Sequence, residues 1–298
     1  MPRVVIGVDA GGSSTVAALA QDGAILRTIS GPPANASVCG AEEASSAIAD
    51  TIVAALDGAL PHAIFVGAAG AGRPGVAAAI SETLQSRFSH ARIGVRDDAY
   101  IALRACVPEG DGAVLVAGTG SIAFAVSGSA EFRCGGYGYL LGDDGSGFAI
   151  GSAALRTVLR ALDERAPRDA FVERLLEETG TGALPGLLAR VYGDGGGVAF
   201  VASLAPLVLE IANQGDRTAN KIVQTAALEL SDMGKSIAKR SGLAQTGAPL
   251  ALAGSLLTSN SLLTFLLETR LKNDLPSMAV YKSNAHPVSG AVAAAELL

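Results

Sequence analysis

Two carboxylates stand where predicted buried strands end, a position from which they could take part in phosphoryl transfer. Asp9 follows the strand predicted for Val4–Val8, and its side chain is the type of ligand that holds magnesium, directly or through water. Asp98 follows the strand predicted for Ala91–Val95, where a general base could lie between a hydroxyl group and a γ-phosphate. Helix capping is the competing interpretation, because Asp97 or Asp98 could accept hydrogen bonds from the first amides of a helix.

A glycine-rich loop follows the first of these strands. Adjacent Gly11 and Gly12 let the backbone approach a phosphate closely. The hydroxyl groups of Ser13 and Thr15 add hydrogen-bond donors. A hairpin turn built on two glycines would look similar. The loop is not a Walker A loop, because no Gly-Lys-Ser or Gly-Lys-Thr follows it.

Two further glycine turns follow predicted strands in the second half of the chain. After the strand Ala113–Ala117, the turn Gly118–Ser121 again has glycines, which leave room for a ligand beside the backbone, and two residues with hydroxyl groups. Taken alone, this turn could simply close a hairpin. Its significance is that it repeats the design of the first loop. The other turn ends the strand-like segment Leu250–Ser255.

The most unusual segment is Cys134–Gly147, in which six of fourteen residues are glycine. Glycines are costly in backbone entropy where regular structure is intended, so the segment more plausibly serves a ligand than a core. A flexible surface loop is the alternative. The apolar side chains of Tyr137, Tyr139, Leu140 and Leu141 indicate instead that part of the segment is packed.

The elements that position these residues form two similar series. The first is a meander of three strands followed by alternating helices and strands, which does not match the strict alternation of a simple dinucleotide-binding fold. A turn-rich break at 108–112 precedes the second series. The repeated strand–loop–strand unit suggests a duplication, with a nucleotide cleft between two lobes. The predicted strands are Val4–Val8, Val16–Leu19, Ala24–Ile29, Ala63–Ala68, Ala91–Val95, Ala113–Ala117 and Ile122–Val126, and the predicted helices are Glu42–Leu60, Gly75–Phe88, Asp98–Ala105, much of Gly151–Arg240 and Gly290–Leu298.

Length and composition are those of a globular chain with two cores. The chain has 298 residues, of which 49% are hydrophobic and 17% charged, and this argues against disorder. The net charge of −6 and the absence of a Lys/Arg cluster disfavour a nucleic-acid partner. The N-terminus lacks the apolar core of a signal peptide, and the longest apolar stretch, 198–209, is too short to cross a bilayer. We therefore expect a soluble, cytoplasmic protein without a membrane partner.

Cysteine and histidine usage indicates no metal centre and no disulfide framework. The three cysteines are odd in number and contain no Cys-x-x-Cys pattern. The three histidines are scattered, and isolated histidines are more often structural than ligands. These residues are Cys39, Cys106, Cys134, His62, His90 and His286.

A series of motifs, in order and spanning essentially the whole chain, resembles the N-acetylglucosamine kinase family within the wider BadF/BadG/BcrA/BcrD ATPase group. The glycine-rich segment is the most specific of them. The motifs are DAGGSST, PPANAS, GAAGAG, DDAYIAL, AGTGS, CGGYGYLLGDDGSG, LAGSLL and HPVSGAVAAA. The resemblance implies an α/β protein with the two-lobed, actin-like (ribonuclease H-like) ATPase fold. Its N-terminal lobe would be 1–110, closed by a C-terminal helix at 287–298, and its second lobe 111–286.

The resemblance also implies ATP and Mg²⁺ as cofactors and assigns residues to them. Asp9 corresponds to the position near magnesium. The adenosine-type turn is Gly254 with Ser255, where the absence of a side chain admits the nucleoside. The residues assigned to the phosphates are Gly11, Gly12, Ser13 and Thr15 in the first loop and Gly118, Thr119 and Gly120 in the second.

For the sugar, the resemblance makes Asp98 the catalytic base. The expected substrate is an amino sugar, because Asn35, Asp143 and the glycine-rich segment match the family's sugar-binding positions. The family commonly has tryptophan where this chain has Tyr137, so the expectation includes glucosamine beside N-acetylglucosamine. The residues assigned to the sugar are Asn35, Gly70, Asp98, Gly136, Tyr137 and Asp143. We also expect the enzyme to be a homodimer.

Two other functions fit the same phosphate loops. One is an ATPase that activates another enzyme, but members of the wider group that do so hold an iron–sulfur cluster, and the cysteines here have no comparable spacing. The other is a sensor without chemistry. A transcriptional sensor would usually add a basic DNA-binding module, whereas this chain starts directly at its first strand.

Overall fold

The computed structural model describes residues 3–180, 184–193 and 197–298, which fold into two compact units. Unit 1 comprises Met1–Gly110 with Asn284–Leu298, and unit 2 comprises Asp111–Ser283. Each unit contains a five-stranded mixed sheet, and the chain crosses from one unit to the other twice.

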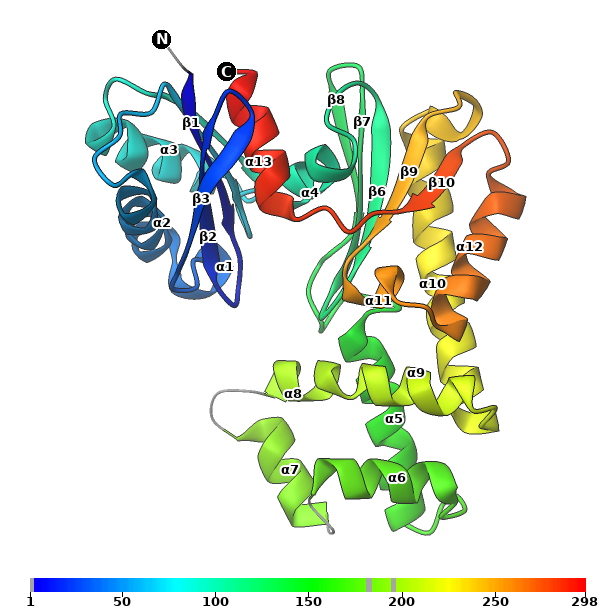
Figure 1. Cartoon of the computed structure of the whole chain (residues 1–298). Coiled ribbons are helices and arrows are strands. Elements are labelled where there is room, and N and C mark those ends of the chain that lie inside the picture. Colours follow the sequence, from blue (N-terminus) through cyan, green and yellow to red (C-terminus); the bar gives the residue numbers. More distant parts are fainter. Residues whose placement is uncertain (1–2, 181–183, 194–196) are drawn as a thin grey trace. The chain divides into compact units, whose positions relative to one another are not determined.

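The sheet of unit 1 has the strand order β3-β2-β1-β4-β5 (Figure 1). β2 pairs antiparallel with both β1 and β3, whereas β4 runs parallel to β1 and β5 runs parallel to β4. The carboxyl ends of three strands therefore meet at one edge of the sheet. The strands are β1 (Val4–Ala10), β2 (Thr15–Gln21), β3 (Ala24–Gly31), β4 (Ala63–Ala68) and β5 (Arg92–Asp97).

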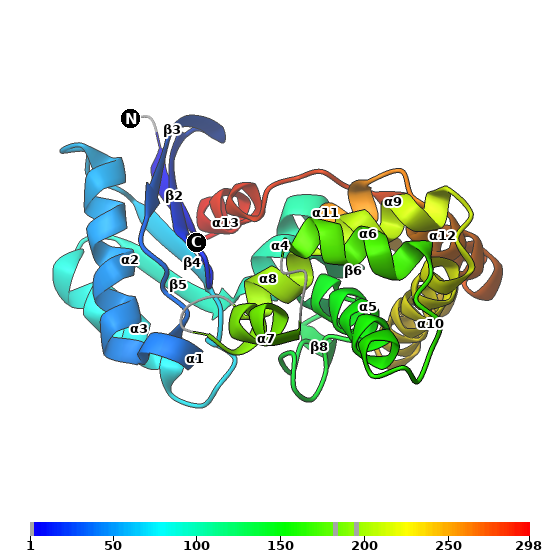
Figure 2. The ribbon, with the colours of Figure 1, turned by 90° about the horizontal axis from the view of Figure 1, so that it is seen from below.

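Helices cover both faces of this sheet, because β1 carries apolar side chains on both sides. Ile6 and Val8 belong to the core under one pair of helices, and Val5 belongs to the core under the other pair. The two pairs lie on opposite faces in Figure 2. They are α2 (Ala41–Leu56) with α3 (Val76–Arg87), and α4 (Asp98–Cys106) with α13 (Pro287–Glu296). A short helix, α1 (Ala36–Cys39), precedes α2.

Unit 2 repeats the strand order and the strand directions of unit 1. Its order is β10-β9-β6-β7-β8, in which β7 pairs antiparallel with β6 and β8, and β9 runs parallel to β6 and β10. The sequence predicted this repetition from its strand–loop–strand units. The strands are β6 (Gly112–Ala117), β7 (Ser121–Ser127), β8 (Ala130–Gly135), β9 (Pro249–Ala253) and β10 (Ala279–Lys282).

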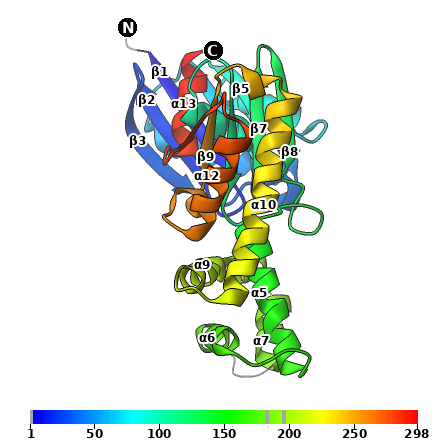
Figure 3. The ribbon, with the colours of Figure 1, turned by 90° about the vertical axis from the view of Figure 1, so that its right-hand side faces the viewer.

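The helices of unit 2 divide into those that pack on the sheet and those that extend away from it (Figure 3). α10 (Arg217–Arg240) belongs to both groups, because it packs against the sheet and continues into the extended part. α12 (Leu262–Asp274) packs beside it, and α11 (Ser255–Thr258) follows β9. The extended part consists of α5 (Gly147–Leu162), α6 (Ala170–Thr179), α7 (Leu184–Tyr192), α8 (Gly197–Ser203) and α9 (Ala205–Asn213).

Most element boundaries differ from the predicted ones by a few residues, for local reasons. α2 ends at Leu56 rather than Leu60, because Asp57 adopts a left-handed conformation with φ of 48°. The last helix starts at Pro287, where the family resemblance put its start, and not at Gly290 as the local pattern predicted, since proline is favoured in the first turn. β8 was not predicted, and its end occupies the first two residues of the glycine-rich segment.

None of the described helices is by itself long and apolar enough to span a membrane. The bent pair Leu184–Tyr192 and Gly197–Asn213 would meet that test together, by length and composition only.

Candidate active site

Parallel pairing brings Asp9 and Asp98 to the same edge of the unit 1 sheet. Ala10 is in register with Ala68, and Ala68 with Asp97, so the last residues of β1, β4 and β5 form one row. Asp9 and Asp98 lie next to this row and are close enough for their charges to interact. Two carboxylates far apart in the sequence are therefore close in space.

Of the two adjacent aspartates, one caps the helix that follows them. Asp97 is the N-cap of α4, and its Oδ1 accepts a hydrogen bond from the Ala99 amide at 3.2 Å. Asp98 is the first residue of the helix and not its N-cap, although a hydrogen bond from the Ala99 amide also acts on its carboxylate and lowers its pKa. Its half-buried carboxylate is left at the sheet edge.

Both carboxylates hold their protons more tightly than usual. Burial, followed by the charge of Asp97, a hydrogen bond to that side chain and the charge of Asp9, raises the pKa of Asp98 to about 7. Burial raises the pKa of Asp9 to about 6. A carboxylate with a pKa near neutrality is suited to accept a proton at physiological pH, and buried neighbouring carboxylates also favour a cation.

The first glycine loop lies beside Asn35 and Gly70. The Ala34 amide donates to the carbonyl of Gly11 at 3.1 Å, and a Cβ atom at Gly12 would lie 3.6 Å from Nδ2 of Asn35. Asn35 Oδ1 caps α1 by accepting from the Ser37 amide at 2.9 Å. A Cβ at Gly70 would in turn meet Ser37, so these predicted site residues are brought together.

The hydroxyl groups of the first loop are presented differently. Ser13 is exposed, as a ligand-binding donor requires. Thr15 begins β2 and is fully buried, and its Oγ1 has no hydrogen-bond partner among the described residues. Its hydroxyl is therefore not presented at the surface of the loop.

The second glycine loop is fastened to the N-terminal turn of α5. The amide of Gly147 donates to the carbonyl of Gly118 at 2.8 Å, and the amide of Phe148 donates to the carbonyl of Thr119 at 3.1 Å. Thr119 is exposed. The carbonyls of the loop occupy the first two amides of α5, so any attraction of this helix end for phosphate comes from the helix dipole and not from free helix amides.

Asp143 lies against this second loop. A Cβ at Gly120 would be only 2.8 Å from Oδ2 of Asp143, and the carboxylate accepts hydrogen bonds from the amides of Ser121 and Gly138. Burial raises the pKa of Asp143, and these two hydrogen bonds oppose that effect. Sequence reasoning missed this contact, because nothing in the local pattern relates the glycine-rich segment to the second loop.

The packing expected for the glycine-rich segment was wrong. Tyr137, Leu140 and Leu141 are 64%, 79% and 88% exposed, and Tyr139 is exposed apart from its contact with Phe148, at 4.9 Å between ring centroids. The glycines of the segment pack against neighbouring elements, for example Gly136 against Ile122 of β7 and Gly145 against Leu230 of α10. The apolar side chains between them point to solvent. The segment thus presents an apolar surface.

The adenosine-type turn adjoins the second loop. Gly254 has φ of +89°, and a Cβ there would lie 2.4 Å from the carbonyl oxygen of Ala117. Ser255 is exposed, and its Oγ would lie 3.8 Å from a Cβ at Gly118. The ends of β6 and β9 therefore place both turns side by side in unit 2.

We expect Gly254→Ala to lower the free energy of unfolding by about 3 kcal/mol or more, since it combines a left-handed backbone with a clash against backbone atoms. Gly118→Ala is the matched control, because its new methyl group would meet only ordinary contacts. Urea unfolding of both variants measures the difference. Equal destabilisation would contradict this account of Gly254.

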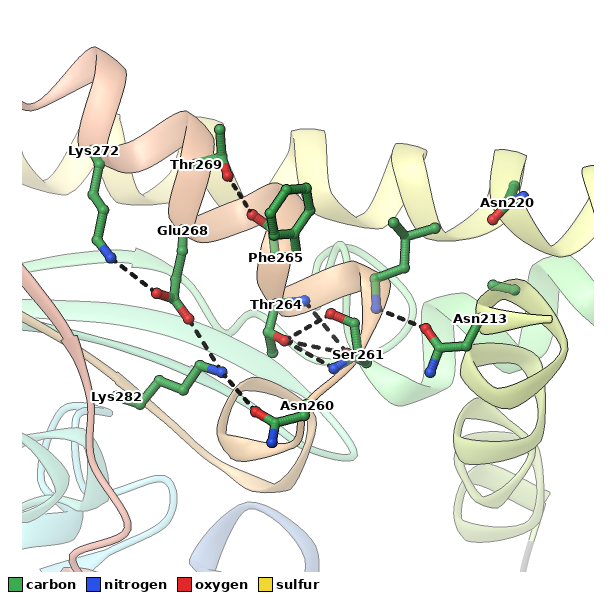
Figure 4. Close-up of a pocket in the computed structure, with 12 residues that line it drawn as sticks. Asn213, Asn220, Asn260, Ser261, Thr264, Phe265, Glu268, Thr269, Lys272 and Lys282 are labelled. Atoms are coloured by element: carbon green, nitrogen blue, oxygen red, sulfur yellow. Dashed lines mark hydrogen bonds and ion pairs between the residues drawn. The ribbon is translucent and has the colours of Figure 1, made fainter. Parts of the chain in front are cut away.

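A pocket of about 880 Å³ opens beside α11 and α12 in unit 2 (Figure 4), and sequence reasoning did not find it. A network joins three of its charged side chains: Glu268 accepts from Lys272 at 3.1 Å and pairs with Lys282 at 3.2 Å. Lys282 also reaches Oδ1 of Asn260, at 3.4 Å. The aromatic ring of Phe265 is 66% exposed.

The two sheets have the same strand order, and in each a glycine loop connects the first two strands, β1 to β2 and β6 to β7. This is the actin-like ATPase fold of sugar kinases. The chain belongs to the BadF/BadG/BcrA/BcrD ATPase family, whose profile matches residues 6–297. Membership of this family implies the use of ATP, as the sequence predicted.

Three similar proteins are informative. The N-acetylmuramic acid/N-acetylglucosamine kinase of Clostridium acetobutylicum is 27% identical, over 97% of each chain. The N-acetyl-D-glucosamine kinase of Dictyostelium discoideum is 33% identical, over 66% of this chain and 63% of the relative. A crystal structure from Chromobacterium violaceum, provisionally assigned as an N-acetylglucosamine kinase, is 26% identical with a TM-score of 0.77, covering 97% of this chain and 98% of that one.

Proposed function

We propose that this protein is an ATP-dependent kinase of an amino sugar, N-acetylglucosamine or glucosamine, with Asp98 as its general base. The observation that carries the proposal is the position of Asp98, which is not needed as a helix cap, has a pKa of about 7 and lies at the sheet edge with Asp9. The names of the three similar proteins support the choice of an amino sugar.

In the proposed reaction, the ionised carboxylate of Asp98 accepts the proton of a sugar hydroxyl group. The hydroxyl oxygen forms a bond to the γ-phosphorus of ATP, and the bond between that phosphorus and the β,γ-bridging oxygen breaks. The products are a sugar phosphate and ADP, and the proton remains on Asp98 until it is lost to solvent. A base with a pKa near the working pH combines a sizeable ionised fraction with useful basicity.

The glycine loops support the proposed reaction by holding the phosphates rather than by covalent chemistry. Gly12 and Ser13 of the first loop, and Thr119 and Gly120 of the second, offer backbone amides and hydroxyl groups on exposed or half-buried turns. Gly118 closes the second turn, because its amide donates to the carbonyl of Gly120 at 2.9 Å. In phosphoryl transfer, positioning and charge neutralisation supply most of the acceleration. We assign Gly254 and Ser255 to the nucleoside.

The residues of unit 1 fit a magnesium ion held together with ATP. The described residues contain no cluster of three or more His, Cys, Asp or Glu side chains that would form a complete cage. Magnesium usually needs only one or two carboxylates, because the phosphates of the nucleotide and water supply its other ligands. The raised pKa of Asp9 is consistent with a carboxylate that lacks a counterion. When bound, the ion would neutralise charge on the phosphates.

For the sugar we assign Asn35, Gly70, Gly136, Tyr137 and Asp143. The contact between Asn35 and the first loop, and that between Asp143 and the second, would bring sugar-binding groups close to the phosphates in each unit. Tyr137 is exposed and can offer an aromatic face to a sugar ring.

A coupled assay of ADP release tests the proposal directly. We expect release to depend on N-acetylglucosamine or glucosamine, and to be much slower with glucose, N-acetylmannosamine or no sugar. The panel should also contain N-acetylmuramate, given the substrate named for the Clostridium relative. ADP release that no sugar stimulates would favour an ATPase that activates a partner, and nucleotide binding without turnover would favour a sensor.

The rate should depend on pH through Asp98. Because the carboxylate form is required, kcat/KM is expected to fall as the pH drops below about 7. Asp97→Asn should move this acidic limb to lower pH, since the charge and hydrogen bond of Asp97 raise the pKa of Asp98. Asparagine retains the N-cap, so folding is preserved. An unchanged limb in the pH profile of kcat/KM would argue against Asp98 as the titrating base.

A further inference from the structure

Arg133, near the end of β8, is fastened to the start of the glycine-rich segment by its guanidinium group. Its Nε donates to the carbonyl of Gly135 at 3.2 Å, and its Nη2 donates to the carbonyl of Gly136. The same group lies over the ring of Tyr137, 5.8 Å from the ring centroid. One side chain thus contacts three consecutive residues of the segment.

These contacts require both the arginine and the glycines. Gly135 and Gly136 have φ of +72° and +68°, which turn their carbonyls toward the guanidinium group. A Cβ at Gly136 would lie 2.9 Å from Nη2 of Arg133 and 2.8 Å from Cδ1 of Ile122, so the group packs directly on the backbone. The planar fork of arginine can donate to two carbonyls and stack on an aromatic ring at once, whereas lysine cannot.

Hydrogen bonds of Gly138 connect the part of the segment that Arg133 contacts with Asp143. The carbonyl of Gly138 accepts from the Gly142 amide at 2.9 Å, and the Gly138 amide donates to the carboxylate of Asp143. A Cβ at Gly142 would lie 3.3 Å from Cβ of Tyr137, so the turn closes on itself. The positive charge of Arg133 also acts on Asp143, where it opposes the rise in pKa that burial causes.

We propose that Arg133 is a positioning residue of the sugar site, which holds Tyr137 and Asp143 in the arrangement that binds the amino sugar. The inference rests on the proposed function, because it assigns these two residues to the sugar. Arg133 itself need not touch the substrate. We expect its main effect on the sugar site, because its guanidinium group contacts Gly135, Gly136 and Tyr137.

The strand that carries Arg133 has an independent anchor. Nη1 of Arg240, on α10, donates to the backbone carbonyl of Arg133 at 2.8 Å, and β8 pairs with β7 along its length. Removing the Arg133 guanidinium group should therefore leave β8 in place. Arg240→Met removes one bond to the same strand without touching the segment, which makes it the matched control.

Steady-state kinetics of Arg133→Met, Arg133→Lys and Arg240→Met test the proposal. We expect Arg133→Met to raise the KM for the amino sugar about tenfold or more, the effect of losing charge-assisted hydrogen bonds, with the KM for ATP changed less than about twofold. Arg133→Lys should fall between the wild type and Arg133→Met, and Arg240→Met should leave both constants unchanged. An unchanged sugar KM in Arg133→Met, or an equal effect in Arg240→Met, would overturn it.

A second measurement needs no activity. The chain contains no tryptophan, so Tyr137→Trp introduces a single fluorophore into the segment. Adding Arg133→Met should shift its emission to the red and increase its quenching by acrylamide, and adding Arg240→Met should not. Identical spectra with and without Arg133 would refute the positioning role even if a variant loses activity. A wild-type protein that phosphorylates no sugar would instead refute the proposed function, and the sugar site with it.

Discussion

Replacing Asp98 by Asn is expected to lower kcat for sugar phosphorylation by about 10²–10⁴-fold, the range that general-base catalysis contributes. The amide cannot accept the proton of the hydroxyl group, but it has nearly the same size and keeps the start of α4 intact. Binding of ATP should therefore remain within about twofold of the wild type, since Asp98 is not assigned to the nucleotide. Rapid-quench measurement of a single turnover separates the chemical step from product release.

The same variant should be more stable than the wild type above pH 7. The folded-state pKa of Asp98, about 7, exceeds the ordinary aspartate value of 3.8, so the native state binds the proton more tightly than the unfolded chain does. Ionising Asp98 therefore costs stability as the pH rises through this interval, and asparagine removes that cost. Thermal unfolding of both proteins at pH 5 and pH 8 should show the gap widening at pH 8.

Asp97→Asn provides the control for Asp98→Asn. Both substitutions remove one negative charge from the start of α4, but Asp97 acts as the cap and not as the proposed base. It should retain most of the turnover at pH 8. If Asp98→Asn phosphorylates the sugar at the normal rate, or if Asp97→Asn is as impaired, the mechanism proposed for Asp98 is wrong.

Replacing Asp9 by Asn is expected to lower turnover by about 10²-fold or more, because it removes the carboxylate assigned to the magnesium-bound nucleotide. The defect should differ from that of Asp98→Asn, since more Mg²⁺ should be needed for half-maximal activity. The residual activity should also extend to lower pH, because the charge of Asp9 is one of the causes that raise the pKa of Asp98. A Mg²⁺ titration at several pH values measures both effects.

Asp22→Asn is a suitable control for Asp9→Asn. Asp22 is an exposed carboxylate of the same unit, in a turn with φ of 49° that asparagine tolerates well. Its Oδ1 accepts from the Arg3 amide at 2.9 Å, and the amide side chain retains that acceptor. We expect unchanged turnover and Mg²⁺ dependence. If Asp9→Asn behaves like this control, Asp9 does not support the metal.

Much of the fold followed from local patterns. The run Val4–Val8 before Gly11 and Gly12 predicted β1 and its loop, because β-branched residues fit a buried strand and adjacent glycines end it. The similar pattern at Ala113–Gly120 predicted β6, its loop and the repetition of the sheet. The local pattern does not predict β8, because its last two residues, Cys134 and Gly135, also begin the glycine-rich segment. Pairing with β7 makes them strand residues.

What the sequence by itself determined is the inventory of groups: two glycine loops with hydroxyl side chains, a further glycine turn after the strand near Leu250, acidic residues at strand ends and a segment too rich in glycine to be a core. It could not choose between Asp97 and Asp98 as the helix cap, because either carboxylate can accept the first amide hydrogen bonds. The tertiary structure decided that Asp97 is the cap.

Only the tertiary structure decided the position of the carboxylates and the pKa of Asp98. Parallel pairing of β1, β4 and β5 places Asp98 near Asp9, and burial beside two other carboxylates raises its pKa to about 7. Likewise, the exposure of Tyr137 and the contact of Asp143 with Gly120 depend on how distant segments pack. A pKa depends on the burial of the group and on the charges around it, and a contact depends on which segments pack together. Neither is a local property of the chain.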